Sequence, residues 1–191
     1  MPTRSQVPKR ETALLIVDVI NPLDFPGGRT VARRSRRMAA RLARLRDRAA
    51  RAGLPVVYVN DNLGLWRSDV ADLVRRCCAR GRPGSALVRA LEPRPTDLVV
   101  LKTTLSGFHQ TPLDALLRLA GARRVIVTGL MADNCVLFTA ADAYMRDYKV
   151  VVPRDCVSAK TPDAMRRALT TMTELLGAST TPSTRLRLSR R

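Results

Sequence analysis

A cysteine stands at the junction of a buried strand and a helix. The apolar run 125–128 stops at Gly129, and Cys135 then opens a segment with helical periodicity. Unpaired backbone N–H groups and the positive end of the helix dipole at such a position favour a thiolate over a thiol. We therefore expect Cys135 to be a reactive nucleophile.

Ionisable residues follow other apolar runs of the chain. Asp18, Asp61 and Lys102 each lie at or just past the end of a different run. A lysine ammonium stabilises a thiolate, and a carboxylate takes and returns a proton. Backbone N–H groups of the turn 130–135 can bind the oxyanion that forms when sulfur adds to a carbonyl. Together these groups predict acyl transfer through a thioester, ending in hydrolysis.

The elements that must position these residues alternate along the chain. Apolar runs typical of buried strands lie at 13–17, 55–59, 96–101, 125–128 and 150–152, with a short edge strand near 178–181. Helices are predicted at 31–52, 70–76, 111–121, 135–147 and 161–176. This alternation indicates an α/β fold with a parallel sheet covered on both faces, in which ligands bind at the carboxyl ends of the strands.

Length and composition favour a single globular domain. The chain has 191 residues, 46% of them apolar, and no apolar run of membrane-spanning length. The start at 1–4 lacks the apolar stretch of a signal peptide, so a cytoplasmic protein is expected. We divide the chain into a flexible basic N-terminus at 1–10, a domain at 11–181 and a basic C-terminal tail at 182–191.

The formal charge of +18 is concentrated in three places. Both ends are basic, and segment 31–52 carries nine arginines against Asp47. Most of these arginines share one side of the predicted helix, which is typical of a solvated surface. Nucleic acid is therefore an unlikely partner, although an accessory interaction with polyanions stays open.

The four cysteines suggest neither a zinc site nor a disulfide framework. Cys77 and Cys78 are adjacent, and Cys135 and Cys156 stand apart, without a CxxC spacing. We interpret all four as free thiols.

Three motifs carry a resemblance to a known family. Residues 14–18, the Lys102 segment through 113, and 127–136 resemble the isochorismatase-like cysteine hydrolase superfamily, and the similarity covers about 12–177. The resemblance implies a three-layer α/β/α sandwich, Rossmann-like, with a mostly parallel six-stranded sheet. It also implies an Asp18–Lys102–Cys135 triad, a non-proline cis peptide at Leu130–Met131, and assembly into dimers or larger homo-oligomers.

Departures from the family limit what can be carried over. Relatives acting as nicotinamidases have an Asp-x-His metal motif, but this chain reads Asp61-Asn62-Leu63, and His109 lies elsewhere. Zinc or iron favours imidazole ligands, so no metal and no cofactor is expected. Candidate residues for binding a small-molecule substrate are Phe25, Asn62, Trp66, Phe108 and His109.

Three functions remain open. The first is a metal-independent hydrolase of a small amide or related carbonyl compound. The second is hydrolysis of an isochorismate-type vinyl ether, which uses Asp18 as an acid and needs no thiolate. The third is a non-catalytic basic module that binds nucleic acid or an acidic partner.

Overall fold

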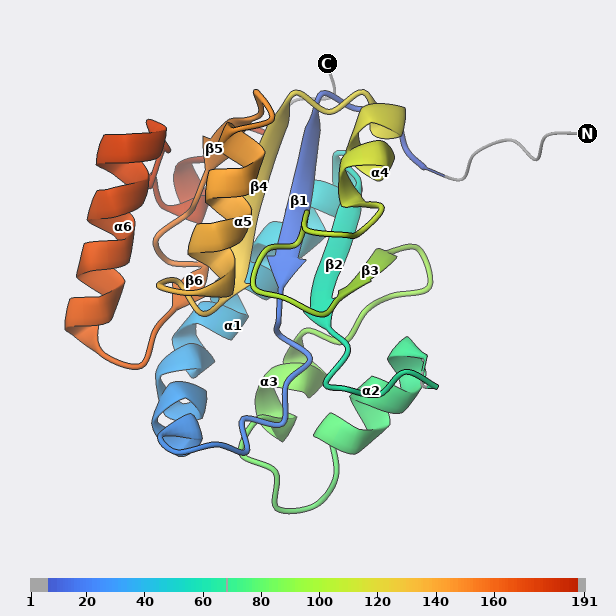
Figure 1. Ribbon diagram of the computed structural model, residues 1–191, viewed down its shortest axis with the longest axis vertical. Helices are drawn as coiled ribbons and strands as arrows, with labels where there is room; N and C mark the ends of the chain where they lie inside the picture. The colour runs from blue at the N-terminus through green and yellow to red at the C-terminus, as the bar shows by residue number, and fades with distance from the viewer. Residues whose placement is uncertain (1–6, 68, 189–191) are drawn as a thin grey trace, which may run out of the picture.

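Six parallel strands form one sheet with helices on both faces, as the computed structural model shows for residues 7–67 and 69–188 (Figure 1). The strands are β1 (Thr12–Val17), β2 (Val56–Asp61), β3 (Leu98–Lys102), β4 (Arg124–Leu130), β5 (Lys149–Val151) and β6 (Val157–Ser158). The helices are α1 (Gly28–Arg51), α2 (Val70–Cys77), α3 (Ser85–Ala90), α4 (Leu113–Ala120), α5 (Cys135–Tyr144), α6 (Pro162–Leu176) and the 3-10 turn η1 (Ser183–Arg185). The three-layer α/β/α architecture is confirmed.

The strand order creates a crevice beside β1. The order is β3-β2-β1-β4-β5, and β6 pairs with the carboxyl end of β4. The chain therefore runs outward from β1 to β3 and returns to β4 on the other side of β1. Ligands of open α/β sheets bind where the strand order reverses in this way. The carboxyl ends of β1 and β4 flank that point.

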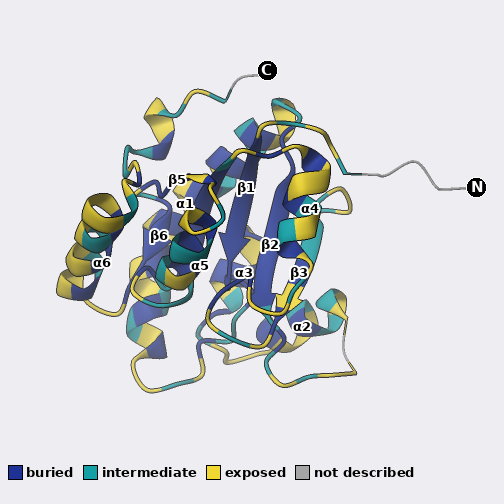
Figure 2. Ribbon diagram, turned by 45° about the horizontal axis from the view of Figure 1, so that its top comes forward, coloured by how far each residue is buried: buried dark blue, intermediate teal, exposed yellow. Residues whose placement is uncertain are grey.

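Alternating residues of the strands build two separate cores. On β1, Leu15 and Val17 pack with the layer of α4, α5 and α6, whereas Leu14 and Ile16 pack with the layer of α1, α2 and α3. Figure 2 shows β1 and β2 as buried throughout most of their length. Burial on both faces explains why these strands read as continuous apolar runs.

Helix α1 confirms the predicted amphipathic pattern but begins earlier. Val31, Leu42 and Leu45 are buried as the helical wheel predicts. Thr30 lies inside its first turn, and Gly27 is the N-cap in the left-handed conformation. Glycine adopts this conformation without steric cost, so the helix starts there.

Two short elements were not predicted. Helix α3 follows directly on the glycine- and proline-rich connector, and its six residues are too few to show a clear period. The sixth strand is β6, whereas the edge strand expected near 178–181 is a single bridge between Val151 and Ser179. A two-residue strand has no pattern of its own in the sequence.

The ends of the described chain pack on the domain. The Arg10 N–H donates to the Ala120 carbonyl at 2.8 Å. Arg48 of α1 donates to the carbonyls of Ser183 at 2.7 Å and Leu186 at 2.5 Å, which holds part of the predicted tail against the helix. Residues 1–6 and 189–191 of the predicted basic ends lie outside the described residues. None of the described helices has the length and apolarity needed to cross a membrane.

Candidate active site

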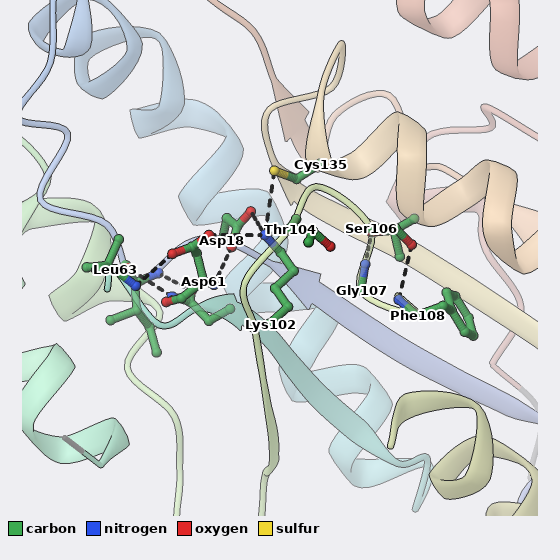
Figure 3. A network of polar contacts seen from close by, with 12 residues as sticks. Asp18, Asp61, Leu63, Lys102, Thr104, Ser106, Gly107, Phe108 and Cys135 are labelled. Atoms are coloured by element: carbon green, nitrogen blue, oxygen red, sulfur yellow. Dashed lines mark hydrogen bonds and ion pairs between the residues drawn. The ribbon is translucent and has the colours of Figure 1, made fainter. Parts of the chain in front are cut away.

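Asp18, Lys102 and Cys135 converge at the carboxyl edge of the sheet (Figure 3). Lys102 Nζ lies 2.8 Å from Asp18 Oδ2 and 3.7 Å from Cys135 Sγ. The Asp18 carboxylate also lies close enough to the Cys135 thiol to raise its pKa. Asp61 lies beside them, with its Oδ2 3.9 Å from Lys102 Nζ. Residues from three separate strand ends thus form one cluster at the crevice.

Gly129 allows β4 to end against β1. Its φ is 106°, and a Cβ atom at this position would lie 2.0 Å from the carbonyl oxygen of Val17. Only glycine fits such a close backbone approach in this conformation. The chain then turns and enters α5 at Cys135, which places the sulfur beside the residue that follows Val17, namely Asp18.

Backbone groups fix the two charged members of the cluster. Asp18 has a positive φ of 49°, and its Oδ1 accepts a hydrogen bond from the Asp61 N–H at 2.7 Å. Lys102 Nζ donates to the Thr104 carbonyl at 2.9 Å. The exposed fractions of Asp18 and Lys102 are only 5% and 1%. A buried ion pair held by further hydrogen bonds keeps one geometry.

The environment makes Asp18 a stronger base than a surface carboxylate. Burial raises the pKa of Asp18 above its ordinary value of 3.8, although Lys102 and the hydrogen bonds from Cys135 and Asp61 oppose the rise. Burial lowers the pKa of Lys102, but Asp18, Cys135 and Asp61 together raise it above 10.5. Lys102 is therefore an ammonium at neutral pH.

The resting state of Cys135 differs from the sequence-based expectation. Burial, followed by the neighbouring Asp18 carboxylate, raises the pKa of the Cys135 thiol to about 12, and Lys102 lowers it by less. The position at the start of α5 therefore does not produce a stable thiolate. The thiol instead keeps its proton beside the Asp18 carboxylate, the group that can remove it.

The turn before Cys135 contains the cis peptide that the family resemblance implied, at Leu130–Met131. Ala132 donates to the Ser158 carbonyl at 2.8 Å, and Asn134 donates to the Met131 carbonyl at 2.9 Å. The turn is thereby tied to β6 and to itself. Within the described chain, the N–H groups of Met131 and Cys135 donate to no protein acceptor.

A cavity of about 340 Å³ opens beside Lys102. Asn62 and Trp66, two of the predicted substrate-binding residues, line it together with Leu65, Leu101, Thr103 and Gln110. Asn62 is buried and its Oδ1 accepts from the Gly64 N–H at 2.9 Å, whereas Trp66 is 79% exposed. The four further lining residues lie in loops or at the end of β3 and have no motif that marks them in the sequence.

The other three predicted substrate-binding residues do not line this cavity. Phe108 is buried in the core, where its ring lies 6.0 Å from that of Tyr148, and it points away from Cys135 (Figure 3). Phe108 is therefore directed into the core and not into this cavity. His109 is exposed to solvent, and Phe25 packs under the Lys160 ammonium, 5.3 Å from the ring centroid.

A larger cavity, of about 650 Å³, lies at the opposite edge of the sheet. Glu11, Arg124 and Lys149 line it at the amino ends of β1, β4 and β5. It contains none of the three clustered residues. The smaller cavity shares Lys102 with the cluster, although Asp18 and Cys135 do not line it, so it is the cavity that we associate with the candidate active site.

Comparisons with known proteins identify the family. The model of the family described as isochorismatase domain matches residues 12–184. The chain belongs to the isochorismatase family. Over 173 residues it is 34% identical to the uncharacterized isochorismatase family protein YaaI of Bacillus subtilis strain 168, covering 91% of this chain and 94% of that protein. The protein is accordingly an isochorismatase-family hydrolase.

Amidohydrolases are prominent among the similar proteins. The ureidoacrylate amidohydrolase RutB of Methylobacterium radiotolerans is 31% identical over 182 residues, covering 82% of this chain and 70% of that protein. The crystal structure of N-carbamoylsarcosine amidase from Thermoplasma acidophilum matches with a TM-score of 0.70 and 29% identity, covering 93% and 99% of the two chains. The nicotinamidase SaPncA of Staphylococcus aureus matches with a TM-score of 0.65 and 26% identity, covering 90% and 97%.

The described residues do not fit a metal centre. Among them, no group of three or more histidine, cysteine, aspartate or glutamate residues is placed to hold an ion. Leu63 stands where nicotinamidase-like relatives have the second ligand of the Asp-x-His motif, and its N–H donates to Asp61 Oδ1 at 2.6 Å. The other oxygen of Asp61 faces Lys102. The chemistry proposed below involves no metal.

Proposed function

We propose that this isochorismatase-family hydrolase cleaves a small amide through a thioester on Cys135. The observation that carries the proposal is the contact of one sulfur with a buried carboxylate and a buried ammonium, Asp18 and Lys102. Covalent catalysis requires a nucleophile close to its base, and a third group that orients the base. The amidohydrolases among the similar proteins support the same chemistry.

The first step forms the carbon–sulfur bond. As Cys135 Sγ adds to the amide carbonyl, its proton passes to Asp18, whose raised pKa makes it a better proton acceptor than a surface carboxylate. Lys102 stabilises the negative charge of the cluster until the proton is transferred. The protonated Asp18 then donates to the amide nitrogen, the carbon–nitrogen bond breaks, and an amine leaves.

The second step reverses the role of Asp18. The carboxylate takes a proton from water as the water oxygen adds to the thioester carbonyl, and the carbon–sulfur bond breaks. Cys135 recovers its proton from Asp18, and a carboxylic acid leaves. Asp18 therefore begins and ends the cycle as a carboxylate, and water is the only co-substrate.

The turn before α5 supplies the oxyanion contacts in this scheme. The N–H groups of Met131 and Cys135 have no protein acceptor among the described residues, and both belong to the turn that presents the sulfur. Donors fixed in advance stabilise the charge that develops on the carbonyl oxygen without reorganising.

The cavity restricts the substrate to a small molecule. A volume of about 340 Å³ lies at the lower end of the range for ligand pockets. Its walls combine the Trp66 indole with the amides of Asn62 and Gln110. We expect a compact, planar amide that places its carbonyl against the sulfur and its body against Trp66.

Intact-mass spectrometry of quenched reactions tests the proposal. With N-carbamoylsarcosine, ureidoacrylate and nicotinamide as the first substrates, turnover should be accompanied by a transient mass gain equal to the acyl group. Cys135→Ala should abolish both the adduct and turnover. Cys78→Ala, which removes another thiol that is not fully buried, should retain both. Amide turnover that survives in Cys135→Ala would overturn the thioester mechanism.

The raised pKa of Asp18 also favours a second candidate, hydrolysis of a vinyl ether. A carboxyl group that holds its proton closer to neutral pH can protonate a vinyl ether directly, without the thiol. Isochorismate separates the two candidates. Turnover of isochorismate that is lost in Asp18→Asn and kept in Cys135→Ala would establish this alternative.

A further inference from the structure

Helix α1 presents an exposed surface made mostly of arginine. Its 24 residues contain ten arginines and one acidic residue, Asp47. The buried side packs in the core through residues such as Val31, Leu42 and Leu45. Eight of the arginines are exposed, and on a helical wheel of about 100° per residue they lie within an arc of about 160°. We call these eight residues the arginine face, namely Arg29, Arg33, Arg34, Arg36, Arg37, Arg41, Arg44 and Arg51.

The charges of the arginine face are not neutralised by carboxylates of the protein. Within the part of the chain that the structure describes, none of the eight arginines forms an ion pair with aspartate or glutamate. Asp47, the one carboxylate of α1, pairs instead with Arg94. Helix α4 differs, because its Arg118 lies 2.8 Å from Asp114, and α6 contains a similar pair. The partial neutralisation seen on α4 and α6 is therefore absent from the arginine face.

The basic surface continues beyond the arginine face at the end of α1, and it is hollowed at the start of α1. At the end, the hydrogen bonds from Arg48 to the carbonyls of Ser183 and Leu186 hold the C-terminal segment beside the helix. The side chains of Arg185 and Arg187 on that segment are exposed. At the start, a pocket of about 390 Å³ is lined by three members of the arginine face together with Thr30, Ala32 and Pro83, without an acidic residue. A pocket with this lining suits an anionic group.

We propose that the arginine face binds double-stranded DNA through its phosphate backbones. The periodicity of the arginines alone is typical of a solvated surface. The missing carboxylate partners and the pocket without acidic residues instead favour an external polyanion. Arginines that contact phosphates release the counterions condensed on DNA, and this release stabilises the complex regardless of base sequence. The formal charge of +18 adds long-range attraction between the protein and a polyanion.

The composition of α1 favours a nucleic-acid duplex over other anionic partners. Interfaces between proteins have an apolar centre, and helices that lie on membranes insert an apolar side. The apolar side of α1 is buried in the core and serves neither purpose. Proteins that bind single strands stack the bases on aromatic rings, and α1 contains no aromatic residue. A duplex needs only cations placed along its backbones.

The dimensions of α1 match the major groove of B-DNA. With 24 residues the helix is about 36 Å long, and one turn of the duplex spans about 34–36 Å. A helix with its side chains is about 10–12 Å wide, and the major groove is about 12 Å wide. Arg29 and Arg36 lie at one margin of the arginine face, and Arg34 and Arg41 lie at the other. The two margins can therefore contact the two backbones that border the groove.

Fluorescence anisotropy with a labelled DNA duplex of about 20 base pairs, two helical turns, tests the proposal independently of activity. For the full chain, the logarithm of the binding constant should fall linearly with the logarithm of salt concentration, with a slope of about −0.9 for each phosphate contacted. The triple variant Arg33→Gln, Arg37→Gln and Arg44→Gln should make this slope shallower by about 3 and weaken binding at least about tenfold. The matched control replaces three exposed cations outside α1, as Arg123→Gln, Lys149→Gln and Arg167→Gln. It removes the same charge and should change the slope by less than about 1.

Each other outcome contradicts the proposal. Failure of the wild-type chain to bind the duplex at about 50 mM salt, where phosphate contacts are strong, would exclude it. An equal loss of binding in both triple variants would reflect net charge rather than the arginine face. Tighter binding of a single-stranded oligonucleotide, of poly-L-glutamate or of phosphatidylglycerol vesicles would assign the face to a different partner. Circular dichroism checks that the variants remain folded, and none of these results depends on the identity of the substrate.

Discussion

Lys102 and Arg46 are both buried cations, but their surroundings differ. Lys102 is 1% exposed and Arg46 is 7% exposed. Arg46 Nη1 donates to Tyr58 Oη and to the Glu92 carbonyl, both at 2.8 Å. Lys102 contacts a carboxylate, a thiol and a carbonyl. Lys102 also lines a cavity.

The two buried cations differ in whether the groups around them can exchange a proton at neutral pH. Burial raises the pKa of Tyr58 to about 12, so the phenol beside Arg46 keeps its proton at neutral pH. The partners of Lys102 form a base and a nucleophile that share a proton. Burial of a cation is therefore not enough to mark an active site. Exchangeable protons next to the cation, together with access for a ligand, distinguish the two clusters.

The largest effect is expected from Asp18→Asn, which removes the base and keeps the shape. Turnover of the amide should fall by about 10³-fold, within the usual contribution of a positioned acid–base group. Alkylation of Cys135 by iodoacetamide at pH 8 should become faster, because the Asp18 carboxylate raises the pKa of the thiol and Lys102 lowers it. Steady-state kinetics and mass spectrometry of the labelled peptide measure the two changes.

A fall in turnover together with faster labelling of Cys135 distinguishes the loss of a base from the loss of a structural residue. A general loosening of the site would reduce turnover and also expose the buried thiols Cys77 and Cys156 to the reagent, so their labelling serves as the internal control. If Asp18→Asn left labelling of Cys135 unchanged or slower, Asp18 would not be the group that holds the pKa of the Cys135 thiol high, and its role as the base would be contradicted.

Replacing each cation by methionine compares the two clusters directly. Lys102→Met leaves the Asp18 carboxylate buried without its partner and should cost about 3–5 kcal/mol of stability and nearly all turnover. Arg46→Met leaves a phenol and a carbonyl unpaired and should cost about 1–3 kcal/mol. Urea denaturation gives the stabilities, and activity is compared where both variants are folded.

In folded protein, Arg46→Met should keep turnover close to that of the wild type. A loss of turnover in Arg46→Met as large as in Lys102→Met would remove the distinction between the clusters. Equal activity of Lys102→Met and the wild type would exclude Lys102 from the mechanism.

The pH dependence of kcat/KM reports the base of the Lys102 cluster. Burial raises the pKa of Asp18 above 3.8, and the proposed mechanism needs its carboxylate form. Activity should therefore be lost as pH falls through this raised pKa, by tenfold for each further pH unit. The midpoint of the acid limb should lie above 3.8. A limb centred at or below 3.8, in a protein shown to be folded there, would mean that Asp18 is not the titrating base.

The sequence predicts the triad but not the state of its thiol. Asp18 and Lys102 each follow an apolar run directly, Cys135 opens the helix after another run, and strand order brings such positions together. The pKa of Cys135 depends on how deeply the sulfur is buried and how close Asp18 lies. Both are properties of the packed structure, so the helix-start argument alone predicts the wrong protonation state.

The limits of the fold prediction have a similar cause. The run 13–17 is recognised because it is continuously apolar, and the segment of α1 because it repeats the helical period over many turns. β6 has two residues and is fixed by its pairing with Gly129 and Leu130. Phe108 was a candidate pocket wall, but its side chain is buried in the core, which the sequence does not reveal. The position of a two-residue strand and the direction of a loop side chain depend on contacts between segments that are distant in the sequence.

The smallest effect is expected at the rim of the cavity beside Lys102. Trp66 is 79% exposed, so Trp66→Ala should change stability by less than about 0.5 kcal/mol. If the substrate stacks on the indole, KM should rise about tenfold, which corresponds to about 1.4 kcal/mol of lost binding, with little change in kcat. Trp66→Phe keeps an aromatic face and should recover most of the affinity. A normal KM in Trp66→Ala would place the substrate elsewhere in the cavity, whereas a fall in kcat alone would mean that Trp66 contacts the transition state and not the bound substrate.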